Sequence, residues 1–203
     1  AMAAGNRTRA TVMRACLALF ALAASSIAAA QGYPGLRPRE PGHGGKLLLT
    51  GGVSSIEGAA GGGLTPWALV GGYGTRDQIG ANAFLTRVAL DDYTLASTGA
   101  LVGFHDRFEF SVARQAFDPR AVGASPGLGQ GFTIRQDVYG AKLLLFGDAV
   151  LEQDRWLPQV AVGMQYKSND RGTLLHAIGA RGDHGVDLYA SATKLYLAQS
   201  LLD

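Results

Sequence analysis

Residues 158–167, PQVAVGMQYK, show the pattern that decides the fold, because Val160, Val162 and Met164 alternate with polar or small residues. A period of two is typical of a β-strand with one apolar and one polar face. The stretch RFEFSVARQAF at 107–117 repeats this alternation. The sequence therefore predicts an all-β, antiparallel protein.

Period-two segments bounded by turn residues predict eight strands. They cover 46–57, 67–75, 79–90, 93–104, 107–117, 133–146, 158–167 and 186–197. Strands of soluble proteins average about 5–6 residues, whereas a tilted strand needs about 9–11 residues to cross a bilayer. Most of the predicted strands are long enough to cross, and short turns alternate with longer connections as in outer-membrane barrels. We therefore expect a transmembrane β-barrel, with a soluble β domain as the alternative.

The N-terminal segment has the three parts of a secretory signal. Arg7, Arg9 and Arg14 form a basic stretch, the apolar block CLALFALAASSIAAA follows, and small residues precede Gln31. A membrane anchor would need about 20 apolar residues, which this block does not reach. We therefore expect residues 1–30 to be a cleaved signal peptide.

The segment after the expected cleavage site separates the signal from the β domain. Residues 31–44, QGYPGLRPREPGHG, contain prolines and glycines without periodicity, which predicts a flexible leader. We expect residues 45–203 to form the barrel domain. Cleavage would remove Cys16, the one cysteine, and leave 15 basic and 16 acidic residues. This balance offers no basic surface for nucleic acid, and an exported chain without cysteine has no disulfide to stabilise it.

Five stretches carry a resemblance to a known family. They are GGKLLLTGGVSSIEGAAGGGLTPWALVGGYGTRDQIGANAF, GALVGFHDRFEFSVARQAFD, FTIRQDVYGAKLLLFGDAV, WLPQVAVGMQYKSNDRG and YASATKLYLAQSLL. Together they resemble, over about residues 45 to 202, an uncharacterised proteobacterial family that carries a domain of unknown function and is regarded as porin-like. The resemblance implies location and architecture rather than an activity. Members of that family continue with further strands beyond the equivalent of Asp203, so we expect an incomplete part of a larger barrel.

The sequence contains two weak signals for catalysis or metal binding. Residues 123–127, GASPG, match G-x-S-x-G, but a hydrolase needs a helix after the serine, and Pro126 stands there instead. His176, Asp183 and His184 share one predicted loop, but their spacing matches no known metal site. We therefore expect no enzyme, no metal and no cofactor.

Charged residues that alternate with the apolar set predict the lining of the barrel. They are Lys46, Arg87, Arg107, Glu109, Lys142, Lys167 and Lys194. This excess of bases over acids would make an aqueous lumen attractive to anions. In a closed eight-stranded barrel, side chains would instead fill the interior, and Glu109 would pair with a base.

These patterns lead to an expected function. We expect an outer-membrane barrel in contact with lipid that passes or binds small polar solutes, with a weak preference for anions. One alternative is a non-conducting structural barrel whose loops at 118–132 and 168–185 contact partners, and another is a soluble exported β domain. Nothing in the sequence indicates nucleic acid as a partner, and no pattern sets an oligomeric state.

Overall fold

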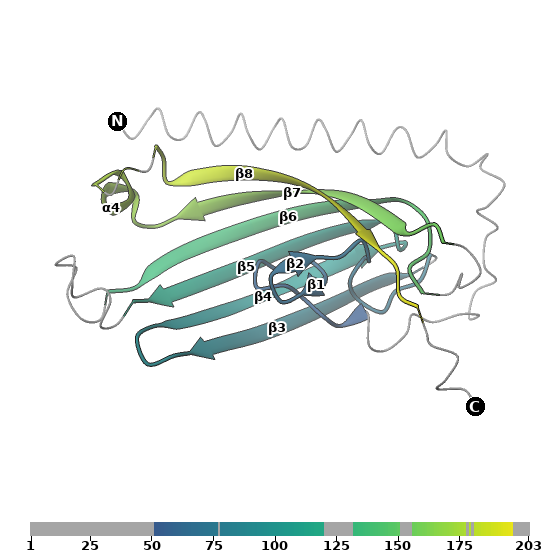
Figure 1. Ribbon diagram of the computed structural model, residues 1–203, viewed down its shortest axis with the longest axis horizontal. Helices are drawn as coiled ribbons and strands as arrows, with labels where there is room; N and C mark the ends of the chain where they lie inside the picture. Colours follow the sequence, from purple (N-terminus) through teal and green to yellow (C-terminus); the bar gives the residue numbers. More distant parts are fainter. Residues whose placement is uncertain are drawn as a thin grey trace. The chain divides into compact units, whose positions relative to one another are not determined.

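The largest element of the fold is a six-stranded antiparallel sheet. The computed structural model describes residues 51–76, 78–119, 132–150, 156–177, 179 and 181–196. Each strand of the sheet pairs with the next along the chain (Figure 1). The strands are β3 (Ile79–Ala89), β4 (Thr94–Phe104), β5 (Phe108–Asp118), β6 (Ile134–Phe146), β7 (Gln159–Asn169) and β8 (His184–Thr193).

A tight turn joins β4 and β5 at one end of the sheet. His105 and Asp106, between β4 and β5, have φ angles of 52° and 49°. Such left-handed backbone suits a two-residue hairpin turn, because its twist matches that of the flanking strands. We call this end of the sheet the turn end. The opposite end, which carries helix α4 (Gly172–Ala177) between β7 and β8, is the loop end.

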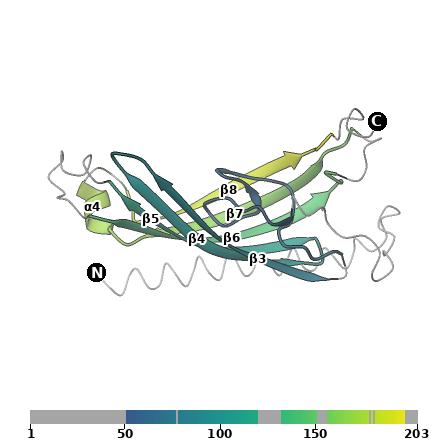
Figure 2. The same ribbon diagram turned by 90° about the horizontal axis from the view of Figure 1, so that it is seen from below.

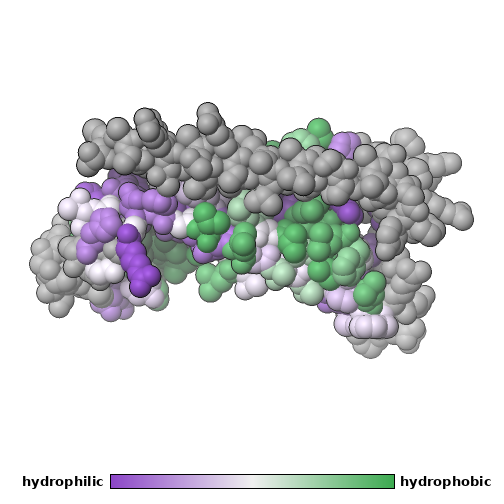
Figure 3. Space-filling view, turned by 90° about the horizontal axis from the view of Figure 1, so that it is seen from above, coloured by the Kyte–Doolittle hydropathy of each residue, from purple (hydrophilic) through white to green (hydrophobic). Residues whose placement is uncertain are grey.

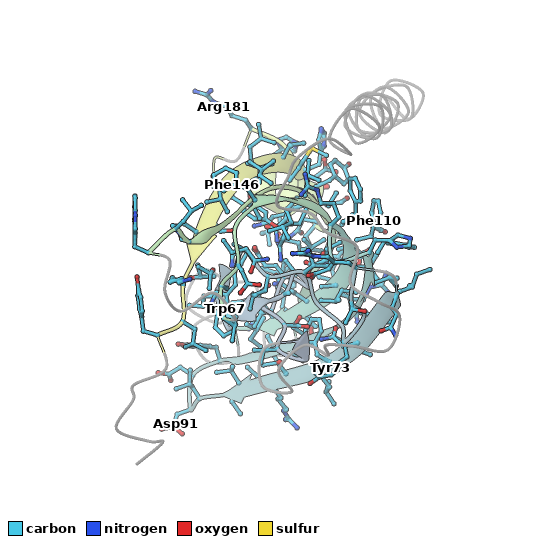
Figure 4. All side chains as sticks on the ribbon, turned by 90° about the vertical axis from the view of Figure 1, so that its right-hand side faces the viewer. Trp67, Tyr73, Asp91, Phe110, Phe146 and Arg181 are labelled. Atoms are coloured by element: carbon cyan, nitrogen blue, oxygen red, sulfur yellow. The ribbon has the colours of Figure 1, made fainter. Side chains whose placement is uncertain are left out.

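The sheet curves into an arch, and a separate segment lies inside the curve. Figure 4 shows the arch along its strands, with Trp67 on the concave side and Phe110 and Phe146 on the convex side. Figure 2 shows the same segment lying across the concave face of the twisted sheet. The segment comprises residues 51–75, which we call the inserted segment. Its regular structure is limited to two paired strands of two residues each, β1 (Gly61–Gly62) and β2 (Thr65–Pro66).

Six of the eight predicted strands are confirmed with small shifts at their ends, and two are wrong. Residues 51–57 and 67–75 belong to the inserted segment instead of the sheet, and residues 46–50 lie outside the described residues. The physical reason is that small apolar residues of this region pack onto the concave face of the sheet. Ala68 and Val70 form a buried cluster with Leu144 of β6 and Ala161 of β7.

In the part of the chain that the structure describes, the sheet ends at β3 and β8, which do not pair with each other. The all-β antiparallel prediction is therefore confirmed, whereas the predicted closed barrel is not seen. No helix among the described residues is long and apolar enough to cross a membrane. The expected signal peptide, the leader and the G-x-S-x-G sequence lie outside the described residues.

Candidate functional site

The centre of the concave face holds a buried ion pair. Glu109 of β5 and Lys142 of β6 are direct cross-strand partners, and Lys142 Nζ lies 3.0 Å from Glu109 Oε1. Both side chains are 1% exposed. A charge taken out of water is destabilising unless it is paired and fully hydrogen-bonded, so each group needs partners beyond the other.

The inserted segment supplies those partners with its backbone. Glu109 accepts hydrogen bonds from the amides of Ala60 and Gly71, at 2.9 and 2.6 Å. Lys142 Nζ donates to the carbonyl oxygens of Ala60 and Leu69, at 3.1 and 2.9 Å. One ion pair of the sheet therefore binds two separate parts of the inserted segment.

A second charged group lies closer to the loop end. Lys167 of β7 forms ion pairs with Glu57 of the inserted segment and with Asp187 of β8, and its Nζ lies 2.8 Å from Asp187 Oδ2. These three side chains are partly exposed, unlike the central pair. Lys167 therefore connects the inserted segment to the sheet while it keeps a partner on the sheet itself.

Further polar contacts fix the inserted segment against β3, β4 and β5. The carbonyl of Ile56 accepts hydrogen bonds from Ser97 Oγ at 2.6 Å and from Gln115 Nε2 at 3.0 Å. Ser54 Oγ donates to Asn82 Oδ1 at 3.3 Å. Hydrogen bonds thus join the segment to the sheet in addition to the apolar cluster around Ala68 and Val70.

Glycines allow the inserted segment to approach the sheet closely. A Cβ atom at Gly103 of β4 would collide with the carbonyl oxygen of Gly71. Gly58 has a φ of 98°, and a Cβ atom there would lie 3.3 Å from the Cβ of Ala113. The backbone of the segment can reach the Glu109 carboxylate because these positions carry no side chain.

The structure brings together three of the predicted charges, Glu109, Lys142 and Lys167, on the concave face. The pairing of Glu109 with a base, expected for a filled interior, is present. Arg107 lies in the turn before β5, where burial and the nearby charge of Arg76 lower its pKa. Whether these residues line a lumen remains a prediction.

The other predicted charges lie elsewhere. Lys194 follows the end of β8 and donates a hydrogen bond to the carbonyl of Asp148, at 3.2 Å. Arg87 lies on the convex face of β3, on the same side as the exposed Leu85. The register expected for Arg87 was ambiguous, because small residues occupy both faces of this strand. Lys46 lies outside the described residues.

Sequence reasoning missed the two acids that bind Lys167. Asp187 alternates with the apolar Val186 and Leu188, and this pattern was sufficient to place it on the concave face. Glu57 had no such signal, because it precedes a glycine-rich run in a region expected to be a strand. Asp183 and His184, two residues of the weak metal signal set aside in the sequence, contact each other, with Oδ1 and Nδ1 2.8 Å apart.

Comparison with known proteins places the chain in a family. Residues 50–202 match the family model described as "Protein of unknown function (DUF3034)". The chain belongs to this family. The DUF3034 match includes the inserted segment and all six long strands, so segment and sheet are parts of one family domain. No curated protein and no solved structure matches the chain.

Proposed function

We propose that this DUF3034 protein is a porin-like β-barrel of the outer membrane in which small polar solutes pass or bind. One observation carries the proposal: the sheet exposes an apolar convex face and buries charged groups on its concave face. Charged and polar side chains are buried on the concave face together with small and aliphatic ones, whereas large apolar side chains are exposed on the convex face. Soluble monomers rarely expose large contiguous apolar patches. The exposed set includes Ile79, Leu85, Phe110, Val112, Tyr139, Val162, Val186 and Leu188.

The strand register arranges these side chains into an apolar band. Three successive rows, counted from the turn end, cross all six strands and contain only apolar or aromatic residues. The rows are Ile79, Phe104, Phe108, Leu143, Val162 and Ala190; then Ala81, Val102, Phe110, Ala141, Met164 and Leu188; then Ala83, Ala100, Val112, Tyr139, Tyr166 and Val186. Such a band suits contact with lipid chains.

The band ends where charge begins. The next row toward the loop end contains Arg114 and Asp137, whose Nε and Oδ1 atoms lie 2.7 Å apart. The tyrosines of the preceding row, Tyr139 and Tyr166, have ring centroids 6.5 Å apart. Aromatic residues next to charged ones are typical of the boundary between hydrocarbon and headgroups. Figure 3 shows apolar residues in the middle of the face it presents and hydrophilic residues toward the end that carries α4.

The lengths of the strands agree with a membrane location. The six strands have between 10 and 13 residues, and a tilted strand needs about 9–11 residues to cross a bilayer. In lipid, the unpaired backbone groups at the edges of β3 and β8 would each cost several kcal/mol. The proposal therefore requires these two edges to be paired in the membrane.

The first experiment uses outer membranes from cells that produce the full chain. The membranes are extracted with detergent, and the protein is run on a denaturing gel with and without boiling. A closed barrel resists the unheated detergent and migrates differently until it is boiled, so we expect a shift. Protein unfolded in urea before loading is the control and should show none. Recovery of the chain in the soluble periplasm would refute the membrane location.

The filled concave face favours a second candidate, a structural barrel that does not conduct. The inserted segment lies where a solute would have to pass, and the buried Glu109–Lys142 pair holds it there. Ion conductance in planar bilayers separates the two candidates. Stepwise currents from the purified protein support passage of solutes, and a protein that inserts into the bilayer without any current supports the structural barrel.

A further inference from the structure

The inserted segment is bound to the sheet in a way that allows it to leave. Both lysines that hold it have an acidic partner on the sheet: Lys142 pairs with Glu109 across β5 and β6, and Lys167 pairs with Asp187 across β7 and β8. If the segment moved away, neither lysine would be left as an isolated charge. Departure would therefore avoid the large penalty of an unpaired buried ion.

The hydrogen bonds between segment and sheet are of a kind that water can replace. Those of the central pair join side chains of the sheet to backbone amides and carbonyls of the segment. In an aqueous interior, water molecules would take over both sides of each bond, so each bond contributes far less to holding the segment than it would in a dry interior.

Some polar groups of the segment and of the sheet find no hydrogen-bond partner among the described residues. Buried side-chain atoms without a hydrogen bond include Ser55 Oγ of the segment, and Asn82 Nδ2, Gln165 Nε2 and Ser191 Oγ of the sheet. Buried polar atoms of this kind are usually bonded to internal water. The contact between segment and sheet thus combines a small apolar cluster with buried polar groups that can bind water.

We propose that residues 51–75 are an internal plug that closes the concave side of the barrel, with Glu57 as a latch on Lys167, and that solutes pass only when the plug shifts. This inference rests on the proposed porin-like function. Glu57 is the one charged group of the latch that belongs to the plug, and Asp187 competes with it for the same lysine. Glu57 therefore favours the closed position of the plug, and Asp187 favours its release.

This opposition gives a matched pair of variants. Glu57→Gln removes the latch and leaves the Lys167–Asp187 pair intact, so we expect the channel to open several times more often than in the wild type. Asp187→Asn leaves Glu57 as the sole acid on Lys167, so we expect fewer openings than in the wild type. If the two acids only stabilised the fold, both substitutions would change the frequency of opening in the same direction. That result would overturn the latch.

A disulfide tests the plug directly in the full-length protein. A Cβ at Gly58 would lie 3.3 Å from that of Ala113, close to the separation of about 3.5–4.5 Å in disulfides. The double variant Gly58→Cys/Ala113→Cys therefore should bind the plug covalently to β5 when oxidised. The strain of a non-glycine residue at position 58 is present in both redox states, so it cancels in the comparison.

Conductance of this double variant in planar bilayers, before and after a reducing agent, is the deciding measurement. We expect no opening in the oxidised protein and openings like those of the wild type after reduction. Equal currents in both states would overturn the plug while the porin-like function stands. Loss of all current from wild type and variants, or failure to insert into membranes, would refute the proposed function and the plug with it. The gel shift on boiling verifies that each variant has folded.

Discussion

Replacing Leu188 by arginine tests whether the convex face lies in lipid. The Leu188 side chain is 79% exposed, and its row has an apolar row on either side. In water, a substitution at such a surface position changes stability by about 0.5 kcal/mol or less. In a bilayer, an arginine on the lipid face near the middle of the membrane costs about 2–4 kcal/mol. The two environments therefore predict different results from one substitution.

Leu85 provides a matched control within the same sheet. Its side chain is 76% exposed, but it lies in the row of the Arg114–Asp137 pair, at the proposed boundary of the band. Arginine near the interface costs about 0–1 kcal/mol in a bilayer. We therefore expect Leu188→Arg to lower the folding equilibrium in vesicles by about 30- to 900-fold, and Leu85→Arg by less than about tenfold.

Urea titration of the protein folded into lipid vesicles measures both values, with the unboiled gel band as the readout of the folded fraction. A larger effect of Leu188→Arg than of Leu85→Arg supports a lipid-facing band. The reasoning would be refuted if the two substitutions had equal effects, or if both variants were as stable as the wild type in vesicles.

Two further substitutions test how the inserted segment is held. Lys142→Met leaves Glu109 buried without its cation, so we expect a loss of about 3–5 kcal/mol of stability in the urea titration. The double variant Lys142→Met/Glu109→Gln should recover part of this loss. A larger loss in the double variant would contradict the pairing. Gly103→Ala places a methyl group against the carbonyl oxygen of Gly71, so we expect limited proteolysis to cleave the segment faster. Gly185→Ala is the control, because a Cβ there has no atom within 4 Å, and equal cleavage of the two variants would contradict the close approach.

The sheet was predictable from the sequence because its strands have two different faces. In β7, Val160 and Val162 point away from the concave face, while Ala161 and Gln165 point toward it. The alternation in the sequence therefore reflects the different surroundings of the convex and concave faces. The inserted segment was not predictable in the same way. Its small residues also alternate loosely, but alternation shows which residues are buried and not which surface buries them.

The candidate site was predictable only in part. Lys142 and Glu109 stand on polar faces of clear strands, so the pattern placed both on one side, but it gave no sign that the backbone of residues 60 to 71 completes their hydrogen bonds. Arg87 was placed on the concave side because β3 has small residues on both faces, which removes the contrast that defines a register. Long-range partners such as Glu57 and Lys167 depend on the path of the chain, which local periodicity does not contain.

The positions of the charges also change what an aqueous interior would select. An anion preference was expected because several bases appeared to face one acid. In the described residues, Lys142 is neutralised by Glu109, and Lys167 by Glu57 and Asp187. Paired charges produce little net electrostatic field in a lumen, so the concave face would attract anions and cations to a similar extent. A barrel lined in this way would discriminate between solutes by size and by hydrogen bonding, and the position of the inserted segment would set that size.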